Sequence, residues 1–232
     1  MANLRRTSAA LALAAALVGP APASAVRHLI GHSVRGRPIY AYELGASHRR
    51  PVLVVGSIHG NEPAGIAIAN MLRQLPLPAG VDLWVIPVLN LDGRAADTRG
   101  NARGIDLNRN FHYAWRPLAG IFDSGPHPLS EPESRAAYRL ILRIRPRLSI
   151  WFHQHLGVVD DSMGSVAVER EYARLVGLPP GKLPIYPGSV SRWENQTISG
   201  TAFVVELRAG ALTVGQARRY ARAVLTLAAA RS

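Results

Sequence analysis

The sequence predicts an α/β protein with three layers (α/β/α), in which a central mixed, mostly parallel sheet lies between helices. Short apolar runs of strand length alternate along the chain with segments whose apolar residues recur at helical spacing. The chain has 232 residues, of which 48% are hydrophobic, which is enough for one well-buried domain and short for two. No internal repeat interrupts the pattern. We therefore expect a single domain over residues 26–232.

The first half of this domain predicts three strands and one helix. The helix follows the second strand, because apolar residues at helical spacing between Ala64 and Leu75 share one face. The third strand ends in NLDG, residues 90–93, which is a turn signal. The three strand segments are RPIYAYEL (37–44), PVLVVGS (51–57) and VDLWVIPVL (81–89).

The second half predicts two more strands, LSIWF and TAFVVEL, and two helices. In the string SEPE, Ser130 is the expected N-cap and Glu133 the N3 residue of a capping box, and the helix that follows should stop at Pro146. The last helix should be capped by Thr213 with Gln216 at N3. Its predicted buried residues are Ala217, Tyr220, Ala221, Val224 and Ala228.

Residues 1–25 have the layout of a secretory signal peptide. Arg5 and Arg6 precede an apolar run of roughly ten residues, and the run is followed by a small-residue cleavage site at Ala23–Ala25. The run is well short of the ~20 residues that a membrane span requires. We expect cleavage after Ala25 and a mature protein that is secreted, periplasmic or cell-wall associated, without stable membrane insertion.

The charge of the chain limits the partners that it can have. The formal net charge is +12, and nearly all of the positive charge is arginine, since Lys182 is the only lysine. A basic protein outside the cell is attracted to polyanionic walls, membranes or acidic substrates. No DNA-binding motif or aromatic-basic interleaving accompanies the arginines, so no nucleic-acid partner is expected. The chain has no cysteine and so no disulfide. A monomer is favoured.

Residues able to bind a metal follow three of the predicted strands. His59 and Glu62 come just after VLVV, His153 and His155 follow LSIWF, and Glu206 closes AFVVE. In open α/β sheets, ligands bind beyond the carboxyl ends of the strands. A catalytic zinc takes three protein ligands and keeps a fourth position for water. His59, Glu62 and one histidine of HQH would satisfy that requirement.

Each of these residues also has an ordinary structural interpretation. Glu62 could be an acid favoured in a first helical turn. His153 and His155 alternate along a strand and share a face, where one of them could be a hydrogen-bonded core residue. Glu206 could pair with Arg208. The zinc site is preferred because independent accidents would not be expected at the ends of successive strands.

Several spaced strings resemble the zinc carboxypeptidases of the M14 type, and the length is nearest to the small bacterial murein peptide amidase branch of that family. The opening IGHSVRGRPIYAYELG also resembles the first hairpin of the family, so the likeness spans nearly all of the mature chain. GIDLNRNF is among the more specific strings. The strings are, in order, HGNE, NLDG, TRGNARGIDLNRNF, PLSEPES, LSIWFHQ and FVVEL.

The resemblance implies that His59, Glu62 and His153 bind one Zn²⁺ and that Glu206 is the general base. His155 would line the adjoining substrate subsite.

The resemblance also implies three roles in the string TRGNARGIDLNRNF. Asn108 and Arg109 would hold the terminal carboxylate of the substrate, and Arg99 would polarise the scissile carbonyl and stabilise its oxyanion. A guanidinium matches a carboxylate bidentately, which suits Arg109 to this role. Asp106 would orient a zinc-bound histidine.

Three positions depart from the family pattern or concern substrate choice. NLDG has Leu91 where the family usually has proline. The mobile tyrosine of the digestive enzymes has no clear counterpart, and Tyr186 is the candidate, with a surface-packed loop aromatic as the alternative. The segment before Trp193 contributes to the side-chain pocket in the family, and Arg192 there could receive a carboxylate-bearing side chain or point to solvent.

The sequence therefore predicts a secreted zinc metallocarboxypeptidase that hydrolyses the amide bond next to a free C-terminal carboxylate of a peptide. One alternative is a murein peptide amidase, which cleaves the γ-D-glutamyl-diaminopimelate bond of cell-wall peptides with the same site. Another is an acyl-amino-acid deacylase, which shares the H-x-x-E pattern but not the long string around Asp106. A third is a zinc-less wall-binding protein, which the intact ligand set argues against.

Overall fold

The computed structural model describes residues 25–45 and 50–230, so most of the predicted signal peptide lies outside the described residues. The strands of this part are β1 (Ala25–His32), β2 (Pro38–Leu44), β3 (Val52–Val55), β4 (Leu83–Ile86), β5 (Leu148–Asp160), β6 (Pro180–Gly181) and β7 (Thr201–Arg208). The α-helices are α1 (Ala64–Leu72), α2 (Leu91–Ala96), α3 (Pro132–Ile144), α4 (Val166–Val176), α5 (Val190–Thr197) and α6 (Val214–Ala230). No helix in the described part of the chain is long and apolar enough to cross a membrane.

All seven described strands belong to one mixed sheet, as the sequence predicts. Its order is β1-β2-β4-β3-β5-β6, and β7 also pairs with β5. β3, β4, β5, β6 and β7 pair in parallel, whereas the β1-β2 hairpin and the β2-β4 pair are antiparallel. The carboxyl ends of β3, β5 and β7 therefore meet at one edge, where the candidate metal ligands are expected.

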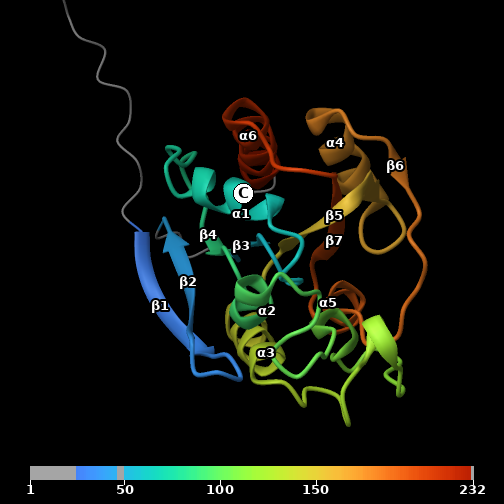
Figure 1. Cartoon of the computed structure of the whole chain (residues 1–232). Helices are drawn as coiled ribbons and strands as arrows, with labels where there is room; N and C mark the ends of the chain where they lie inside the picture. Colours follow the sequence, from blue (N-terminus) through green and yellow to red (C-terminus); the bar gives the residue numbers. More distant parts are fainter. Residues whose placement is uncertain (1–24, 46–49, 231–232) are drawn as a thin grey trace, which may run out of the picture.

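Helices cover both faces of the sheet and complete the three layers. Figure 1 shows α1, α4 and α6 on one side, and α2, α3 and α5 on the other. Two apolar clusters fill the two interfaces. On the first face, Ile68 and Leu72 of α1 and Tyr172 of α4 are fully buried, and on the second face Ala137 and Ile141 of α3 are fully buried. Strands buried on both sides explain why β3 and β4 are continuous apolar runs.

Helix α6 confirms the predicted capping box. The backbone N–H of Gln216 donates to Thr213 Oγ1 at 3.2 Å, and the backbone N–H of Thr213 donates to Gln216 Oε1 at 2.8 Å. All five residues predicted on the apolar face of this helix are buried.

The predicted capping box at SEPE is wrong. Helix α3 begins at Pro132, and its N-cap is Glu131, without a side-chain capping bond. Ser130 Oγ donates to Glu131 Oε1 at 2.9 Å, and Glu133 Oε1 accepts instead from the backbone N–H of Val34 at 3.0 Å. Proline is favoured at the first helical position, which moves the helix start past Ser130.

The predicted turn at NLDG is the start of a helix. Asn90 is the N-cap of α2, and its Oδ1 accepts from the backbone N–H of Gly93 at 2.9 Å. Gly93 also lies against the HGNE loop, since a Cβ on Gly60 would lie only 1.9 Å from the Gly93 carbonyl carbon. The absence of a side chain at Gly60 lets the HGNE loop touch the backbone of α2.

Three other boundaries differ from the sequence prediction. β4 occupies only the centre of the predicted 81–89 segment, and α1 ends at Leu72 rather than near Leu75. β5 continues to Asp160, so HQH lies within the strand. Helices α4 and α5 and the short strand β6 have no counterpart in the prediction.

Candidate metal centre and substrate cavity

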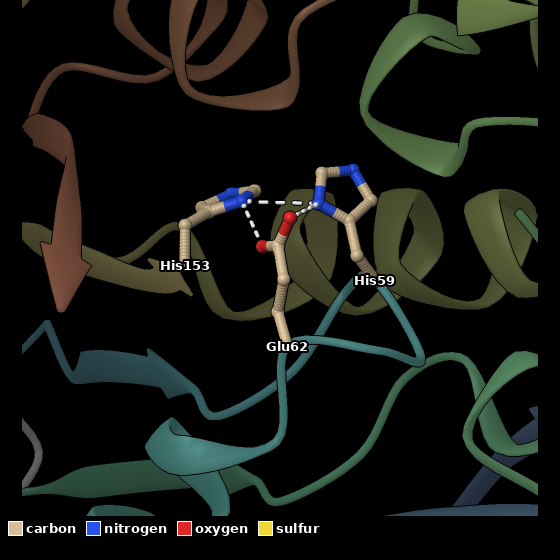
Figure 2. A group of neighbouring side chains, drawn as sticks. All are labelled: His59, Glu62 and His153. Carbon is tan, nitrogen blue, oxygen red and sulfur yellow. Dashed lines mark hydrogen bonds and ion pairs between the residues drawn. The ribbon is translucent and has the colours of Figure 1, made fainter. Parts of the chain in front are cut away.

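Three side chains converge at the carboxyl edge of the sheet. His59 and Glu62 lie in the loop between β3 and α1, and His153 lies in β5 (Figure 2). His59 Nδ1 is 2.9 Å from Glu62 Oε1, His153 Nδ1 is 2.9 Å from Glu62 Oε2, and the two Nδ1 atoms are 3.2 Å apart. Zinc bonds of about 2.0–2.2 Å in tetrahedral geometry place ligand atoms roughly 3.3 Å apart. The three ligand atoms fit a zinc ion.

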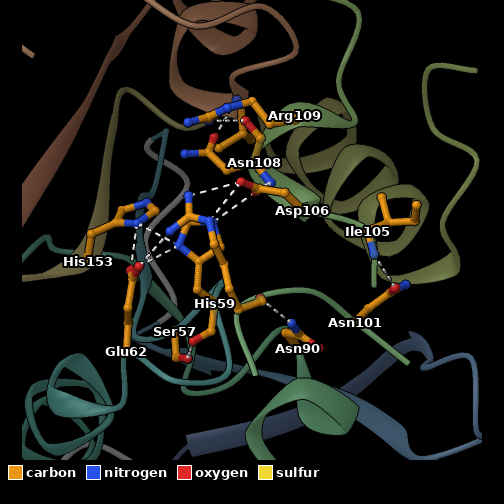
Figure 3. Close-up of polar contacts among 12 residues, drawn as sticks. Ser57, His59, Glu62, Asn90, Asn101, Ile105, Asp106, Asn108, Arg109 and His153 are labelled. Carbon is orange, nitrogen blue, oxygen red and sulfur yellow. Dashed lines mark hydrogen bonds and ion pairs between the residues drawn. The ribbon is translucent and has the colours of Figure 1, made fainter. Parts of the chain in front are cut away.

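Asp106 supports this cluster from behind. Its Oδ1 is 2.9 Å from His59 Nε2 and accepts the backbone N–H of Asn108 at 2.8 Å (Figure 3). The first contact leaves His59 Nδ1 facing the other two ligand atoms. Burial opposes a charge on His59, but the carboxylates of Asp106 and Glu62 outweigh burial and raise the pKa of the imidazole. Asp106 therefore contacts His59, and its role of orienting a zinc-bound histidine stays a prediction.

Arg99 lies between the two buried carboxylates. Its Nη1 donates to Glu62 Oε1 at 2.9 Å, its Nε donates to Asp106 Oδ2 at 3.0 Å, and its Nη2 is 2.9 Å from the same Asp106 oxygen. Burial alone would raise the pKa of the Glu62 carboxyl, but the neighbouring His59 and His153 lower it well below its usual range. Glu62 is therefore ionised, as a metal ligand must be.

Asn108 and Arg109 form a second polar group, which lies above Asp106 in Figure 3. Arg109 is buried, and its Nη1 donates to the carbonyl of Asn108 at 2.7 Å. Asn108 Oδ1 accepts the backbone N–H of Val190 at 3.0 Å, which leaves the amide NH₂ as the group that can donate to a ligand. A Cβ on Gly188 would lie 1.9 Å from the Arg109 carbonyl oxygen, so only glycine allows this close packing.

Aromatic rings cover the Arg109 guanidinium. Its carbon lies 4.1 Å from the centre of the Tyr186 ring and 5.3 Å from that of Phe122. The two rings stack at 5.4 Å, with an interplanar angle of 25°. Burial lowers the pKa of Arg109, although arginine stays charged in proteins. The rings hold the guanidinium in place and shield it from water.

Glu206 lies beside the metal cluster. It is the register partner of His153 in the parallel β5-β7 pair, and its Oε2 is buried without a hydrogen-bond partner among the described residues. No ion pair joins it to Arg208 in the described part of the chain; the Arg208 side chain instead lies against Gly157. An unpaired carboxylate at this place is available to take a proton from a water molecule or a substrate.

One cavity of about 260 Å³ is lined by all ten residues that the sequence analysis predicted for zinc binding, catalysis and substrate binding, whereas Asp106 is not part of its lining. These residues are His59, Glu62, Arg99, Asn108, Arg109, His153, His155, Tyr186, Arg192 and Glu206. They come from distant parts of the chain, between positions 59 and 206. Their meeting in one cavity is what a single active site requires.

His155 and Arg192 differ from the other cavity residues in that each has an ordinary surface alternative. His155 lines the cavity and is exposed, whereas His153 is 3% exposed. Arg192 does not simply face solvent, because it lines the cavity and its Nη2 donates to Ser162 Oγ at 3.3 Å. Ser162 in turn donates to the buried carboxylate of Asp160 at 2.6 Å.

The sequence analysis missed several residues of the cavity wall. Gln154 was visible within WFHQH but was given no role, although its position beside a ligand could have indicated one. Apolar wall residues carry no local signal, because their place depends on how the loops fold. They are Phe122, Leu156, Met163, Leu183, Pro184 and Val204, and Ser189 is a further polar one.

Comparison with known proteins supports the family that the sequence motifs resemble. The family described as zinc carboxypeptidase (Peptidase_M14) matches residues 12–159, which is more than half of the chain. Murein peptide amidase A of Vibrio campbellii is 31% identical over 188 residues, covering 72% of this chain and 73% of that protein. Murein peptide amidase A of Escherichia coli K12 is 31% identical over 145 residues, covering 56% of this chain and 60% of that protein.

Solved structures share the fold. The murein-tripeptide amidase of Escherichia coli O157 superposes with a TM-score of 0.74 at 25% identity, covering 87% of this chain and 90% of that one. Bovine thrombin-activatable fibrinolysis inhibitor superposes with a TM-score of 0.72 at 21% identity, covering 89% and 88%. The first listed curated relatives are matched over less than two thirds of their own length, and the cluster of His59, Glu62 and His153 could hold a metal ion. The chain belongs to the zinc carboxypeptidase family.

Proposed function

We propose that the protein is a carboxypeptidase that hydrolyses the amide bond next to a free C-terminal carboxylate. The observation that carries this proposal is the content of one cavity: a His-Glu-His cluster, an unpaired carboxylate, and a buried arginine. We assign the zinc to His59, Glu62 and His153. Zinc bound there would acidify a water molecule to a pKa of about 7 and polarise a carbonyl.

Glu206 is the proposed general base. It is adjacent to His153 in the sheet, and its buried Oε2 has no hydrogen-bond partner in the described part of the chain. A carboxylate in this state can take a proton from the attacking water and return it to the leaving amine. Because Glu206 is not one of the three clustered ligands, its chemistry can be separated from metal binding.

Arg99 is proposed to stabilise the developing oxyanion. Its three contacts with Glu62 and Asp106 use one N–H of each guanidinium nitrogen. A guanidinium has five N–H groups, so two remain for a substrate carbonyl. The two carboxylates fix the guanidinium plane before the substrate arrives, which is the condition for effective electrostatic stabilisation.

Arg109 and Asn108 are proposed to hold the terminal carboxylate of the substrate. A substrate held at its carboxylate presents only the neighbouring amide to the metal, which makes the enzyme an exopeptidase. Tyr186 and Phe122 shield Arg109 from water, and charged hydrogen bonds contribute on the order of 1.5–3 kcal/mol each. Tyr186 is the proposed cover over the bound substrate.

The test compares peptides with free and amidated C-termini. Amidation removes the charge, so kcat/KM should fall by at least about tenfold, which is roughly 1.4 kcal/mol. Arg109→Lys should also be impaired, because a point charge cannot replace the planar fork, whereas Arg139→Lys on the exposed surface of α3 should behave as the unmodified protein. Equal cleavage of both peptides would exclude the carboxylate anchor.

A second candidate activity is hydrolysis of the γ-D-glutamyl-diaminopimelate bond of cell-wall peptides. The observation that favours it is Arg192, a second arginine on the cavity that contains Arg109, with no ion-pair partner in the described residues. Diaminopimelate has a carboxylate at each end and could engage both arginines. The relatives named murein peptide amidase A support the same substrate class.

Two murein peptides separate the candidates. One ends in diaminopimelate and the other in lysine, which lacks the distal carboxylate. An amidase should prefer the first by about tenfold or more in kcat/KM, and Arg192→Leu should remove most of that preference. An ordinary carboxypeptidase should cleave common α-peptides better than either, with products identified by mass spectrometry.

We also propose export of the protein, followed by cleavage after Ala25. The basic start, short apolar run and small-residue site of the N-terminus support this location. N-terminal sequencing of the mature protein, isolated from the medium or periplasm of the expressing cell, is the direct test. A mature chain that begins at Met1 would contradict it.

A further inference from the structure

Gln154 joins three elements of the site through its side chain. Its Oε1 accepts the backbone N–H of Ala64, the first residue of α1, at 2.8 Å. Its Nε2 donates to the carbonyl of Arg208 at 3.2 Å and to that of Gly210 at 2.9 Å. The side chain thus bridges the helix that follows the HGNE loop and the segment that follows β7.

The backbone of Gln154 is part of the metal cluster itself. Its N–H donates to Glu62 Oε2 at 3.3 Å, and the preceding residue is His153. Because this contact uses the backbone, replacing the Gln154 side chain leaves the donor to Glu62 in place.

Gln154 also lines a second, wider cavity of about 820 Å³. The two cavities share Glu62, Arg99, Gln154 and His155, so they meet at the metal cluster. The outer wall of the second cavity is formed by residues 209–212, and most of its lining is small or apolar. Arg109 lines the first cavity and not the second. A substrate whose terminal carboxylate is bound by Arg109 would therefore cross the metal cluster and extend the residues on the N-terminal side of the scissile bond, its acyl side, into the second cavity.

We propose that Gln154 is a positioning residue that fixes segment 208–212 relative to the metal ligands, so that this segment forms the wall for the acyl side of an extended peptide. The inference rests on the proposed function for the direction of the substrate. An amide is the side chain that can accept from Ala64 and donate to two carbonyls at once. The carboxylate of glutamate has the same shape, but it would face the Arg208 and Gly210 carbonyls without a proton to donate.

The experiment uses Gln154→Glu and Gln154→Met in the zinc-loaded full chain, with Gln74→Glu as the control. Gln74 is exposed and follows α1 away from the cavities. Each protein is assayed with an N-acetylated dipeptide and a pentapeptide that share the same C-terminal pair. Gln154→Glu loses the two bonds to the Arg208 and Gly210 carbonyls, and Gln154→Met loses these and the bond from Ala64. Either loss should reduce kcat/KM for the pentapeptide by about tenfold or more. The dipeptide should change by less than about threefold, since it does not reach the wall.

Amide hydrogen exchange of residues 208–212 is measured on the same proteins without substrate. Exchange there should be faster in both Gln154 variants and unchanged in Gln74→Glu, while all proteins keep one zinc per chain. If one Gln154 variant does not fold, the other decides. Equal losses for both peptides, unchanged exchange, or loss of zinc would overturn the proposal. If the unmodified protein cleaves neither peptide, the proposed function fails, whereas the exchange measurement still tests the position of the wall.

Discussion

Replacing Asp106 by asparagine should weaken zinc binding without touching a ligand. The carboxylate receives four contacts between 2.8 and 3.0 Å, from His59, from Asn108 and from two nitrogens of Arg99. Asparagine offers one acceptor oxygen and one NH₂ group. In either orientation of the amide, the NH₂ group faces a donor, either the histidine ring or the guanidinium.

The size of the effect follows from this geometry. Asp106 is fully buried, so no water can replace a lost contact. Removing the partner of a metal-bound histidine typically costs 10–100-fold in metal affinity, or about 1.4–2.7 kcal/mol. We expect the zinc Kd of Asp106→Asn to rise within this range. The activity of the zinc-saturated variant should also fall, because Arg99 and Asn108 lose the same anchor.

The assay is competition for zinc with a chelator of known affinity. Asp92→Asn is the matched control, because Asp92 is also buried and accepts from the backbone N–H of Arg35, away from the metal cluster. This control should lose thermal stability and keep the zinc Kd of the unmodified protein. A Kd for Asp106→Asn within about twofold of the unmodified value, or an equal change in Asp92→Asn, would refute the role of Asp106.

Three further predictions concern the ligands, the base and a buried acid. His153→Ala should lose zinc while His155→Ala keeps it, because only His153 belongs to the cluster. The opposite result in a metal assay would show that His155, and not His153, is the ligand. Glu206→Gln should keep zinc and substrate but lose about 10²–10⁴ in turnover, and near-normal turnover would remove Glu206 from the chemistry. Burial raises the pKa of the Glu194 carboxyl from 4.5 to about 7, against the opposing bonds from Ser149 and Trp151. The folded state therefore binds the Glu194 proton more tightly than the unfolded state does. The protonated carboxyl contributes fully to the free energy of unfolding below pH 4.5, and this contribution is lost as the pH rises through 7. Glu194→Gln should gain up to about 3 kcal/mol relative to the unmodified protein between pH 4.5 and 8. Urea unfolding across this range checks it, and a difference independent of pH would contradict it.

The sequence by itself determined the features that depend on local pattern. The capping box of α6 was predictable because Thr213 and Gln216 are three residues apart and need no other partner. The strand segments were recognisable because a doubly covered sheet requires continuous apolar runs. The ligand candidates were recognisable because they adjoin apolar strand segments, and because the carboxyl ends of parallel strands share one edge.

Local pattern failed where a distant partner took over a side chain. Ser130 and Glu133 match a capping box, but Asn110 Nδ2 donates to Ser130 Oγ, and Glu133 accepts from Val34, which is 99 residues away in the sequence. The capping residues were therefore not free to cap. Helix α5 was missed for a similar reason, since its first backbone N–H is bound by Asn108, 82 residues away.

The tertiary structure alone decided how the candidate residues are arranged. Pattern placed His153 and His155 on one strand face, but only the folded chain shows which of them meets His59 and Glu62. Only the register of β5 against β7 places Glu206 beside His153. The contacts of Gln154 could not be read from the sequence, because its partner Ala64 is 90 residues away. Sequence pattern reports forces between near neighbours along the chain, whereas a site is built from contacts that exist only after the strands have paired.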